Sequence, residues 1–199
     1  MRTRTLFATK LYENALSDEG LLTEVAQSMR DIAMEDAPGR HWSEQFGCRG
    51  YSGCATKNDV HLHPGPMQQL ADWLVQEAAA FCEECALDLG RRPRLDRMWV
   101  NLLRCDGHQR GHIHARSIIS GTIFVEVPVG AGVTCFEDPR LPLMMAAPPR
   151  ANGAPEDLHT VVAIEPRRGH VIMWESWLRH EVLPGKSSAD RLSVTFDFI

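Results

Sequence analysis

Two histidines separated by one residue, His112 and His114, form the first group in the sequence whose types and spacing suit chemistry. They stand at the beginning of a strand-like run, where side chains alternate between two faces, so residues i and i+2 project from the same face. Both imidazoles can therefore point at one metal ion. A second pair, His61 and His63, precedes Pro64 in an expected turn and has no downstream partner, so we predict a surface loop there.

A third histidine, His180, distinguishes the first pair from the second. It follows an apolar run and a short connection, and we expect it to supply a third ligand from across the barrel. Three protein ligands on one side of an iron ion leave its other positions open, as non-haem iron oxygenases need. His108 is the second choice of ligand in place of His114, because it lies in an expected loop. No catalytic residue is expected beyond the metal ligands.

The last apolar segment of the chain carries an arginine that could bind an anion. Alternation along residues 191–198 puts Arg191 and Ser193 on one face and apolar side chains on the other. A buried arginine is costly unless an anion meets it, and its planar guanidinium matches a carboxylate through two hydrogen bonds. The 5-carboxylate of 2-oxoglutarate would be such an anion, and Ser193 could add a hydroxyl. Asn101 either contacts the co-substrate or pairs a backbone group.

The first part of the chain, about residues 1–95, is expected to be mainly helical. Apolar residues recur there at spacings of three and four, with capping residues before them and Gly or Pro after them. The expected elements are a strand over residues 5–12, a helix from the cap at Ser17 and Asp18 to a stop at Pro38–Gly39, and a helix from Pro66 to Gly90.

From about residue 96 the sequence changes to short runs of β-formers separated by turns. The runs span residues 98–104, 113–127, 133–136, 160–164, 170–174 and 191–198. Several strands at this spacing, with no helical period between them, predict an antiparallel sandwich or barrel. The predicted fold class is therefore α+β but mainly β, with N-terminal helices and a jelly-roll core over about residues 96–199. We expect one domain over residues 1–199.

Composition argues against several classes of function. The net charge of -5 gives no basic footprint for nucleic acid, and no apolar stretch is long enough to span a membrane. The first residues lack the apolar segment of a signal peptide, so we expect a cytoplasmic protein whose six cysteines are reduced. Cys82 and Cys85 have no second ligand pair and are expected to pack in the core.

Two further features bear on the site. Residues 138–158 have no clear period, and a loop of this length is either a binding loop or a disordered insertion. Trp99, Trp174 and Trp177 are expected to belong to the core or to a pocket wall.

Motifs along nearly the whole chain resemble those of one known family. The segments that carry the resemblance are Thr5–Tyr12, Asn101, His112-Ile-His114-Ala-Arg-Ser-Ile-Ile-Ser120-Gly121, Glu137-Asp138-Pro139-Arg140, Trp174-Glu-Ser176-Trp177-Leu178-Arg-His180-Glu-Val182 and Arg191-Leu-Ser193. Through them the chain resembles the bacterial and phage 2-oxoglutarate- and iron(II)-dependent oxygenases. The resemblance implies a double-stranded β-helix, with His112 and His180 on the metal and Arg191 on the co-substrate.

One position departs from the wider oxygenase superfamily. Its usual second ligand is an aspartate or glutamate two residues after the first histidine, and His114 stands here instead. A neutral imidazole in place of a carboxylate leaves the site one unit more positive, which should alter metal preference and redox potential.

The resemblance implies a dioxygenase that uses Fe(II) and 2-oxoglutarate. We expect it to hydroxylate a C–H bond of a small-molecule or peptide substrate, with release of succinate and CO2. The alternative is a cupin-like module that binds a metal or small ligand without 2-oxoglutarate turnover, and a third hypothesis is an all-histidine dioxygenase that works without 2-oxoglutarate. Arg191 separates the first two, because a simple metal module needs no inward arginine.

Overall fold

The computed structural model describes residues 2–46 and 48–199, and its framework is a pair of antiparallel β-sheets. The larger sheet has the strand order β1-β8-β5-β10-β3-β2, and the smaller has the order β4-β9-β6-β7. The strands of the larger sheet are β1 (Tyr12–Ala15), β2 (Gly50–Ser52), β3 (Leu95–Leu103), β5 (Ile119–Glu126), β8 (His170–Glu175) and β10 (Arg191–Phe198). Those of the smaller sheet are β4 (Gln109–His112), β6 (Thr134–Glu137), β7 (Val161–Ile164) and β9 (His180–Val182). The prediction of an antiparallel β core in the second half is confirmed.

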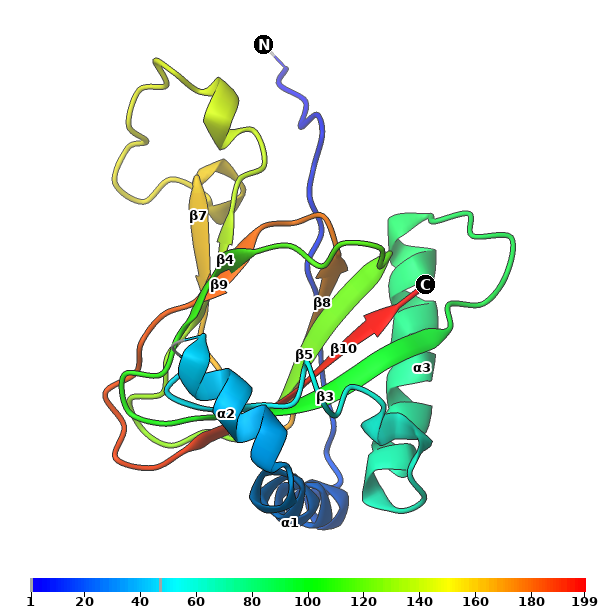
Figure 1. Cartoon of the computed structure of the whole chain (residues 1–199). Coiled ribbons are helices and arrows are strands. Elements are labelled where there is room, and N and C mark those ends of the chain that lie inside the picture. Colours follow the sequence, from blue (N-terminus) through cyan, green and yellow to red (C-terminus); the bar gives the residue numbers. More distant parts are fainter. Residues whose placement is uncertain (1, 47) are drawn as a thin grey trace.

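Three helices accompany the larger sheet (Figure 1). They are α1 (Glu19–Glu35), α2 (Ala37–Gln45) and α3 (Pro66–Cys85). Short 3-10 turns form at Val60–Leu62, Leu141–Leu143 and Glu156–Leu158, the last two within the segment predicted as a long loop. That segment projects from the far end of the smaller sheet in Figure 1.

Capping explains where the first helices begin and end. Asp18 caps α1 by accepting a hydrogen bond from the Leu21 N–H at 2.9 Å, as its position before the apolar stripe predicted. The predicted stop at Pro38–Gly39 is wrong. Asp36 ends α1 and at once caps α2 by accepting from the Gly39 N–H, and proline is favoured in a first helical turn because it has no N–H to leave unpaired.

The other helix and the first strand also differ from expectation at their ends. α3 ends at Cys85, five residues before the predicted end at Gly90, because Ala86 adopts a left-handed conformation with φ 53°. The strand predicted over residues 5–12 begins only at Tyr12. Tyr12 pairs with Met173 of β8, and β8 ends at Glu175, so the residues before about position 10 lie beyond the end of their partner strand.

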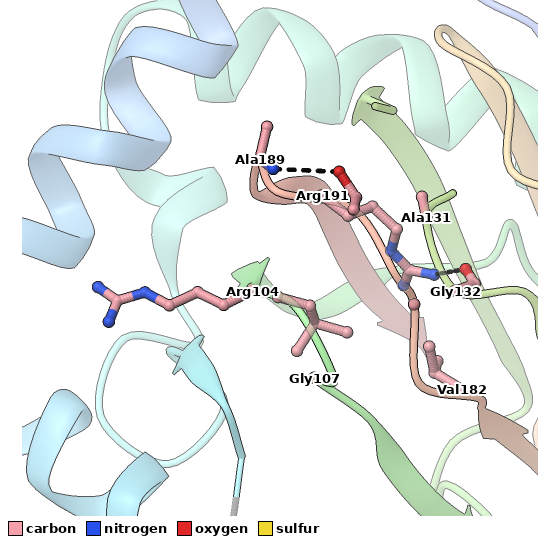
Figure 2. A pocket seen from close by; sticks show the side chains of 10 residues that line it. Arg104, Gly107, Ala131, Gly132, Val182, Ala189 and Arg191 are labelled. Atoms are coloured by element: carbon pink, nitrogen blue, oxygen red, sulfur yellow. Dashed lines mark hydrogen bonds between the residues drawn. The ribbon is translucent and has the colours of Figure 1, made fainter. Parts of the chain in front are cut away.

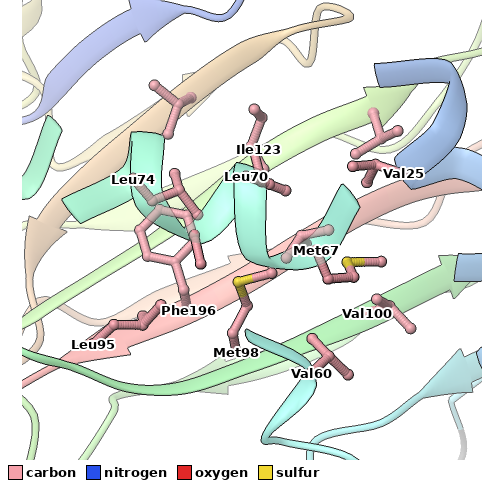
Figure 3. Close-up of a cluster of buried hydrophobic side chains, with 14 of the residues drawn as sticks. Val25, Val60, Met67, Leu70, Leu74, Leu95, Met98, Val100, Ile123 and Phe196 are labelled. Atoms are coloured by element: carbon pink, nitrogen blue, oxygen red, sulfur yellow. The ribbon is translucent and has the colours of Figure 1, made fainter. Parts of the chain in front are cut away.

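The main core lies between the helices and one face of the larger sheet. Figure 3 shows Leu70 and Leu74 of α3 over Ile123 of β5 and Phe196 of β10, all fully buried. Burying side chains of this size contributes about 1.5–3 kcal/mol each. The alternation predicted for β10 is confirmed: its even-numbered residues join this core, whereas the odd-numbered residues from 191 to 197 face the smaller sheet.

Three short strands were missed in the sequence, namely β2, β4 and β9. Each has only three or four residues and, unlike the equally short β6 and β7, does not contain a recognisable run of β-forming residues. The run predicted over residues 113–127 becomes a strand only at Ile119, because the chain turns after β4 and Arg116 has a φ of 72°. Within residues 2–46 and 48–199, no helix has the length and apolar character needed to cross a membrane.

Candidate metal and co-substrate site

His112, His114 and His180 meet between the two sheets. One ligand nitrogen from each lies within 4.8 Å of the others, the only such group of three ligating side chains found in the part of the chain that the structure describes. His112 ends β4 and pairs with His180 at the start of β9, which places their rings across one strand pair. His108, the alternative ligand, lies outside the group.

The geometric reason given for the His112–His114 pair is wrong in one respect. The two residues do not share a strand, since β4 ends at His112 and His114 lies in the following connection. The His114 N–H instead donates to the carbonyl of Ser176 at 3.1 Å, which directs the ring inward. Exposure is 8% for His114 and 5% for His180, so neither imidazole is a surface group.

The hydrogen bonds of the three rings define their tautomers. His112 Nδ1 lies 2.7 Å from the Arg110 carbonyl, and His180 Nδ1 lies 3.0 Å from the Leu178 carbonyl. His114 Nδ1 lies 2.5 Å from a carboxylate oxygen of Asp197. These oxygens only accept, so each Nδ1 must donate and each Nε2 keeps its lone pair.

This arrangement fits a metal ion. His114 Nε2 and His112 Nε2 are 3.2 Å apart, yet neither has a proton to share with the other. Two nitrogens bound at about 2.1 Å and at right angles around one ion would be about 3 Å apart. The two facing lone pairs repel each other, and a cation bound between them would remove this repulsion because both nitrogens would become its ligands.

Burial keeps the rings in their metal-binding form. Burial, and after it the neighbouring His112, lower the pKa of His180 to about 3. Burial also lowers the pKa of His112. Both rings are therefore neutral at physiological pH, as a metal ligand must be.

A cavity of about 370 Å³, including its open mouth, adjoins the histidines. Its other walls are Trp99, Gln109, Thr122, Thr134, Trp174, Val182, Arg191 and Thr195. The expectation that Trp99 and Trp174 form core or pocket wall is confirmed. Trp177 was placed wrongly, since it is 47% exposed and its indole N–H donates to Glu175 at the surface.

Arg191 also lines this cavity and is only 4% exposed. Its Nη1 donates to the Gly132 carbonyl at 2.7 Å, as seen in Figure 2, which shows a neighbouring pocket that Arg191 also lines. Its guanidinium carbon lies 5.2 Å from the centre of the Phe124 ring. Its Nε has no partner among the described groups. Burial lowers the pKa of Arg191 to about 10, with no acidic side chain of the described residues offsetting it, so the group stays charged. Such a cation is ready to receive an anion.

The two other predicted co-substrate residues lie near the cavity without lining it. Asn101 is buried, donates to the Thr195 hydroxyl at 2.9 Å and accepts from the Ser52 hydroxyl at 2.7 Å. It reaches the cavity through Thr195. Ser193 is buried on β10 between Arg191 and Thr195.

Asp197 is the site residue that reading the sequence missed. It is completely buried and contacts His114, Ser120 and Arg97. Burial alone would raise its pKa, but the hydrogen bonds from His114 and Ser120 and the charge of Arg97 hold it below the usual value. The signal was present, because Asp197 shares the inward face of β10 with Arg191.

Known proteins were compared with the chain in sequence and in structure. A family model described as "Putative 2OG-Fe(II) oxygenase" matches residues 97–197, a range that contains the three histidines, Arg191 and Asp197. Comparison with curated proteins gives no significant sequence match.

Several solved structures share the fold. The non-heme alpha ketoglutarate dependent epimerase SnoN from nogalamycin biosynthesis aligns with a TM-score of 0.66 at 17% identity, over 96% of this chain and 77% of its own. A Pseudomonas putida prolyl-4-hydroxylase aligns with a TM-score of 0.62 at 18% identity, over 96% of this chain and 92% of its own. These matches confirm the double-stranded β-helix.

A third match is partial. This chain spans 58% of the length of an oxidoreductase of the 2OG-Fe(II) oxygenase family from Burkholderia pseudomallei, which aligns over 68% of this chain at 16% identity. Its TM-score of 0.47 is too low to bear on the fold.

Proposed function

Because the chain belongs to the 2OG-Fe(II) oxygenase family, whose model spans residues 97–197, we propose that it is a dioxygenase that hydroxylates a C–H bond of a small-molecule or peptide substrate. The family uses Fe(II) and 2-oxoglutarate. The observation that carries the proposal is one cavity lined both by three imidazoles with free Nε2 lone pairs and by a buried guanidinium that has no acidic partner among the described residues. Substrate, dioxygen and 2-oxoglutarate would yield hydroxylated product, succinate and CO2.

The three histidines would provide the metal site for this reaction. His112, His114 and His180 would hold Fe(II) through their Nε2 atoms and leave its remaining positions to ligands from the cavity. When bound, the iron supplies the activation of dioxygen and the oxidative decarboxylation of the co-substrate. The residues of the chain would bind the iron and the co-substrate and orient them.

Arg191 would bind the 5-carboxylate of 2-oxoglutarate. Its free Nε and remaining Nη protons can form two parallel hydrogen bonds with a carboxylate, and its burial excludes the water that would otherwise compete. Thr195, held by Asn101, could add a hydroxyl from the same strand face. Ser193 is proposed for the same carboxylate. Trp99 and Trp174 add apolar surface to walls that are otherwise mostly polar, and this lowers the local dielectric around the polar contacts.

The cupin-like alternative does not account for the buried guanidinium of Arg191. A metal module that takes no anion would gain nothing from a charged guanidinium buried beside its metal, and burying such a charge without a partner is costly. The cost is consistent with a site that awaits a dicarboxylate.

The proposal can be tested by spectroscopy without knowing the substrate. Anaerobic addition of Fe(II) and 2-oxoglutarate to the wild type should produce a visible charge-transfer band, and Arg191→Met should lose it at the same ligand concentrations. Arg104→Met is the matched control, because Arg104 is exposed and its guanidinium points away from Arg191 (Figure 2). The control should keep the band.

Each contrary result selects another function. Fe(II) binding by the wild type without a band on adding 2-oxoglutarate would support the cupin-like module. Dioxygen consumption that is indifferent to 2-oxoglutarate would support the all-histidine dioxygenase. The substrate class can then be approached by measuring succinate release against pools of amino acids, peptides and small metabolites, with the added oxygen located in the product by mass spectrometry.

A further inference from the structure

Asp197 contacts the histidine cluster from behind, near the end of β10. Its Oδ1 lies 2.5 Å from His114 Nδ1, and the side chain is fully buried. We propose that Asp197 is a positioning residue that sets the ring orientation and the tautomer of His114 for metal binding. This inference rests on the proposed function, and it assigns Asp197 a role exerted only through His114.

The register of the larger sheet holds the carboxylate from two sides. Asp197 is paired with Arg97 on β3 and with Ser120 on β5. The Ser120 hydroxyl donates to Oδ1 at 2.7 Å, and Arg97 Nη2 donates to Oδ2 at 2.6 Å. With a partner on each neighbouring strand, the carboxylate cannot turn away from His114 without breaking a bond.

The same network also holds the backbone of His114. Ser120 has one hydroxyl proton, which goes to Asp197, so in the 2.7 Å contact between the two serines Ser176 must be the donor. The carbonyl of Ser176 accepts the N–H of His114 at 3.1 Å. The ring and the backbone of His114 are thus fixed by one connected set of hydrogen bonds.

His114 needs this partner because it lacks the local one that the other two histidines have. His112 and His180 each direct Nδ1 at the carbonyl two residues earlier, that of Arg110 or Leu178. The acceptor for His114 comes instead from 83 residues away in the sequence. A carboxylate there forces the proton onto Nδ1 and leaves Nε2 free for the metal.

This pairing also bears on the unusual histidine at position 114. The wider superfamily that the sequence resembles has a carboxylate ligand there, and this chain keeps a carboxylate directly behind the imidazole instead. Arg97 already pairs with the other oxygen, so the contribution that the contacts support is orientation of His114 rather than a net negative charge.

Metal titration tests the proposal, with Co(II) as the probe and its visible absorption as the readout. Asp197→Ala removes the acceptor and should weaken Co(II) binding roughly 10- to 100-fold. Asp197→Asn keeps an oxygen that can accept from Nδ1, so it should recover part of that loss. Arg94→Met is the matched control: it removes an exposed arginine next to the same strand end, whose guanidinium pairs with Asp96 and contacts neither Asp197 nor the histidines. Its affinity should stay close to that of the wild type.

Three results would overturn the proposal, and they can be told apart. If Asp197→Ala binds Co(II) with wild-type affinity, the role of Asp197 is refuted and the proposed function is not affected. Equal weakening by Arg94→Met and Asp197→Ala would assign the effect to the stability of the strand ends. A wild type that binds no Co(II) would also overturn the metal site of the proposed function.

A second measurement needs no substitution at position 197 and so remains informative if Asp197→Ala does not fold. Wild-type protein with 15N-labelled histidine, free of metal, should show the His114 proton on Nδ1, shifted to low field by the carboxylate. His114→Gln assigns the signal. A proton on Nε2 of His114, or averaging between both nitrogens, would refute the proposal.

Discussion

Replacing Arg191 by methionine should abolish co-substrate binding while leaving the metal-free fold intact or slightly more stable. Burial lowers the pKa of Arg191 well below its ordinary value, to about 10, and because each pKa unit corresponds to about 1.4 kcal/mol, keeping the charge costs about 3 kcal/mol. Against this, the substitution loses the hydrogen bond to Gly132, about 1.5–3 kcal/mol for a charged donor. Contact with Phe124 changes little, because methionine also packs well on aromatic rings.

The two terms nearly cancel, so the free energy of unfolding should change by no more than about 1 kcal/mol. An arginine with a structural ion-pair role would behave differently, since breaking a buried pair costs about 3–5 kcal/mol. Co-substrate binding should respond strongly. Two charge-assisted hydrogen bonds to a carboxylate contribute about 3–6 kcal/mol together, so Kd should rise at least about 100-fold.

Two assays check these values. Urea unfolding of the metal-free protein measures stability, and calorimetric titration of 2-oxoglutarate into the Co(II)-loaded protein measures affinity. Arg104→Met should leave both unchanged. A loss of more than about 3 kcal/mol in Arg191→Met, or unchanged affinity for 2-oxoglutarate, would refute the reasoning.

Three other outcomes follow from the contacts. An unfolded histidine titrates near pH 6.5 and folded His180 near 3, so the unfolded state takes up the proton first as the pH falls. The metal-free protein should therefore lose on the order of 5 kcal/mol of stability between these two pH values. Urea unfolding at a series of pH values measures this loss, and His180→Gln should flatten that part of the profile. Gly121→Ala would put a methyl 2.7 Å from the Ile172 carbonyl and against the Phe196 ring, so the free energy of unfolding should drop by about 1–3 kcal/mol in the same assay. Co(II) at about 100 times its Kd should stabilise the fold by about 2.7 kcal/mol, reversibly with EDTA, and a His112→Gln variant should show little of this gain in thermal melts.

Local patterns in the sequence were enough for the class of fold and for most of the site. The alternation of β10 correctly separated Arg191 from the apolar residues that face the helices, because a strand has a side-chain period of two whatever its neighbours are. The stripe of α1 and the cap at Asp18 were equally local. The histidines were found by residue type and order, and the expectation that they converge agrees with their ligand atoms.

The predicted ends of helices and strands were wrong where the end depends on how neighbouring elements pair with or cap one another. The first strand begins at Tyr12 because β8 ends where it does, and Asp36 ends one helix and caps the next, so that Pro38 continues the chain in a helix instead of stopping it. That residues 1–199 form one domain stays a prediction.

What the amino-acid order determined by itself was the face on which each strand residue lies and the presence of three histidines and one inward arginine. Only the tertiary structure decided that β4 and β9 pair to bring His112 beside His180, and that Asp197 reaches His114. The physical reason is that periodicity selects a face within one element. The partner across that face depends on sheet register and on turns between elements, for which these short segments carry no periodic signal.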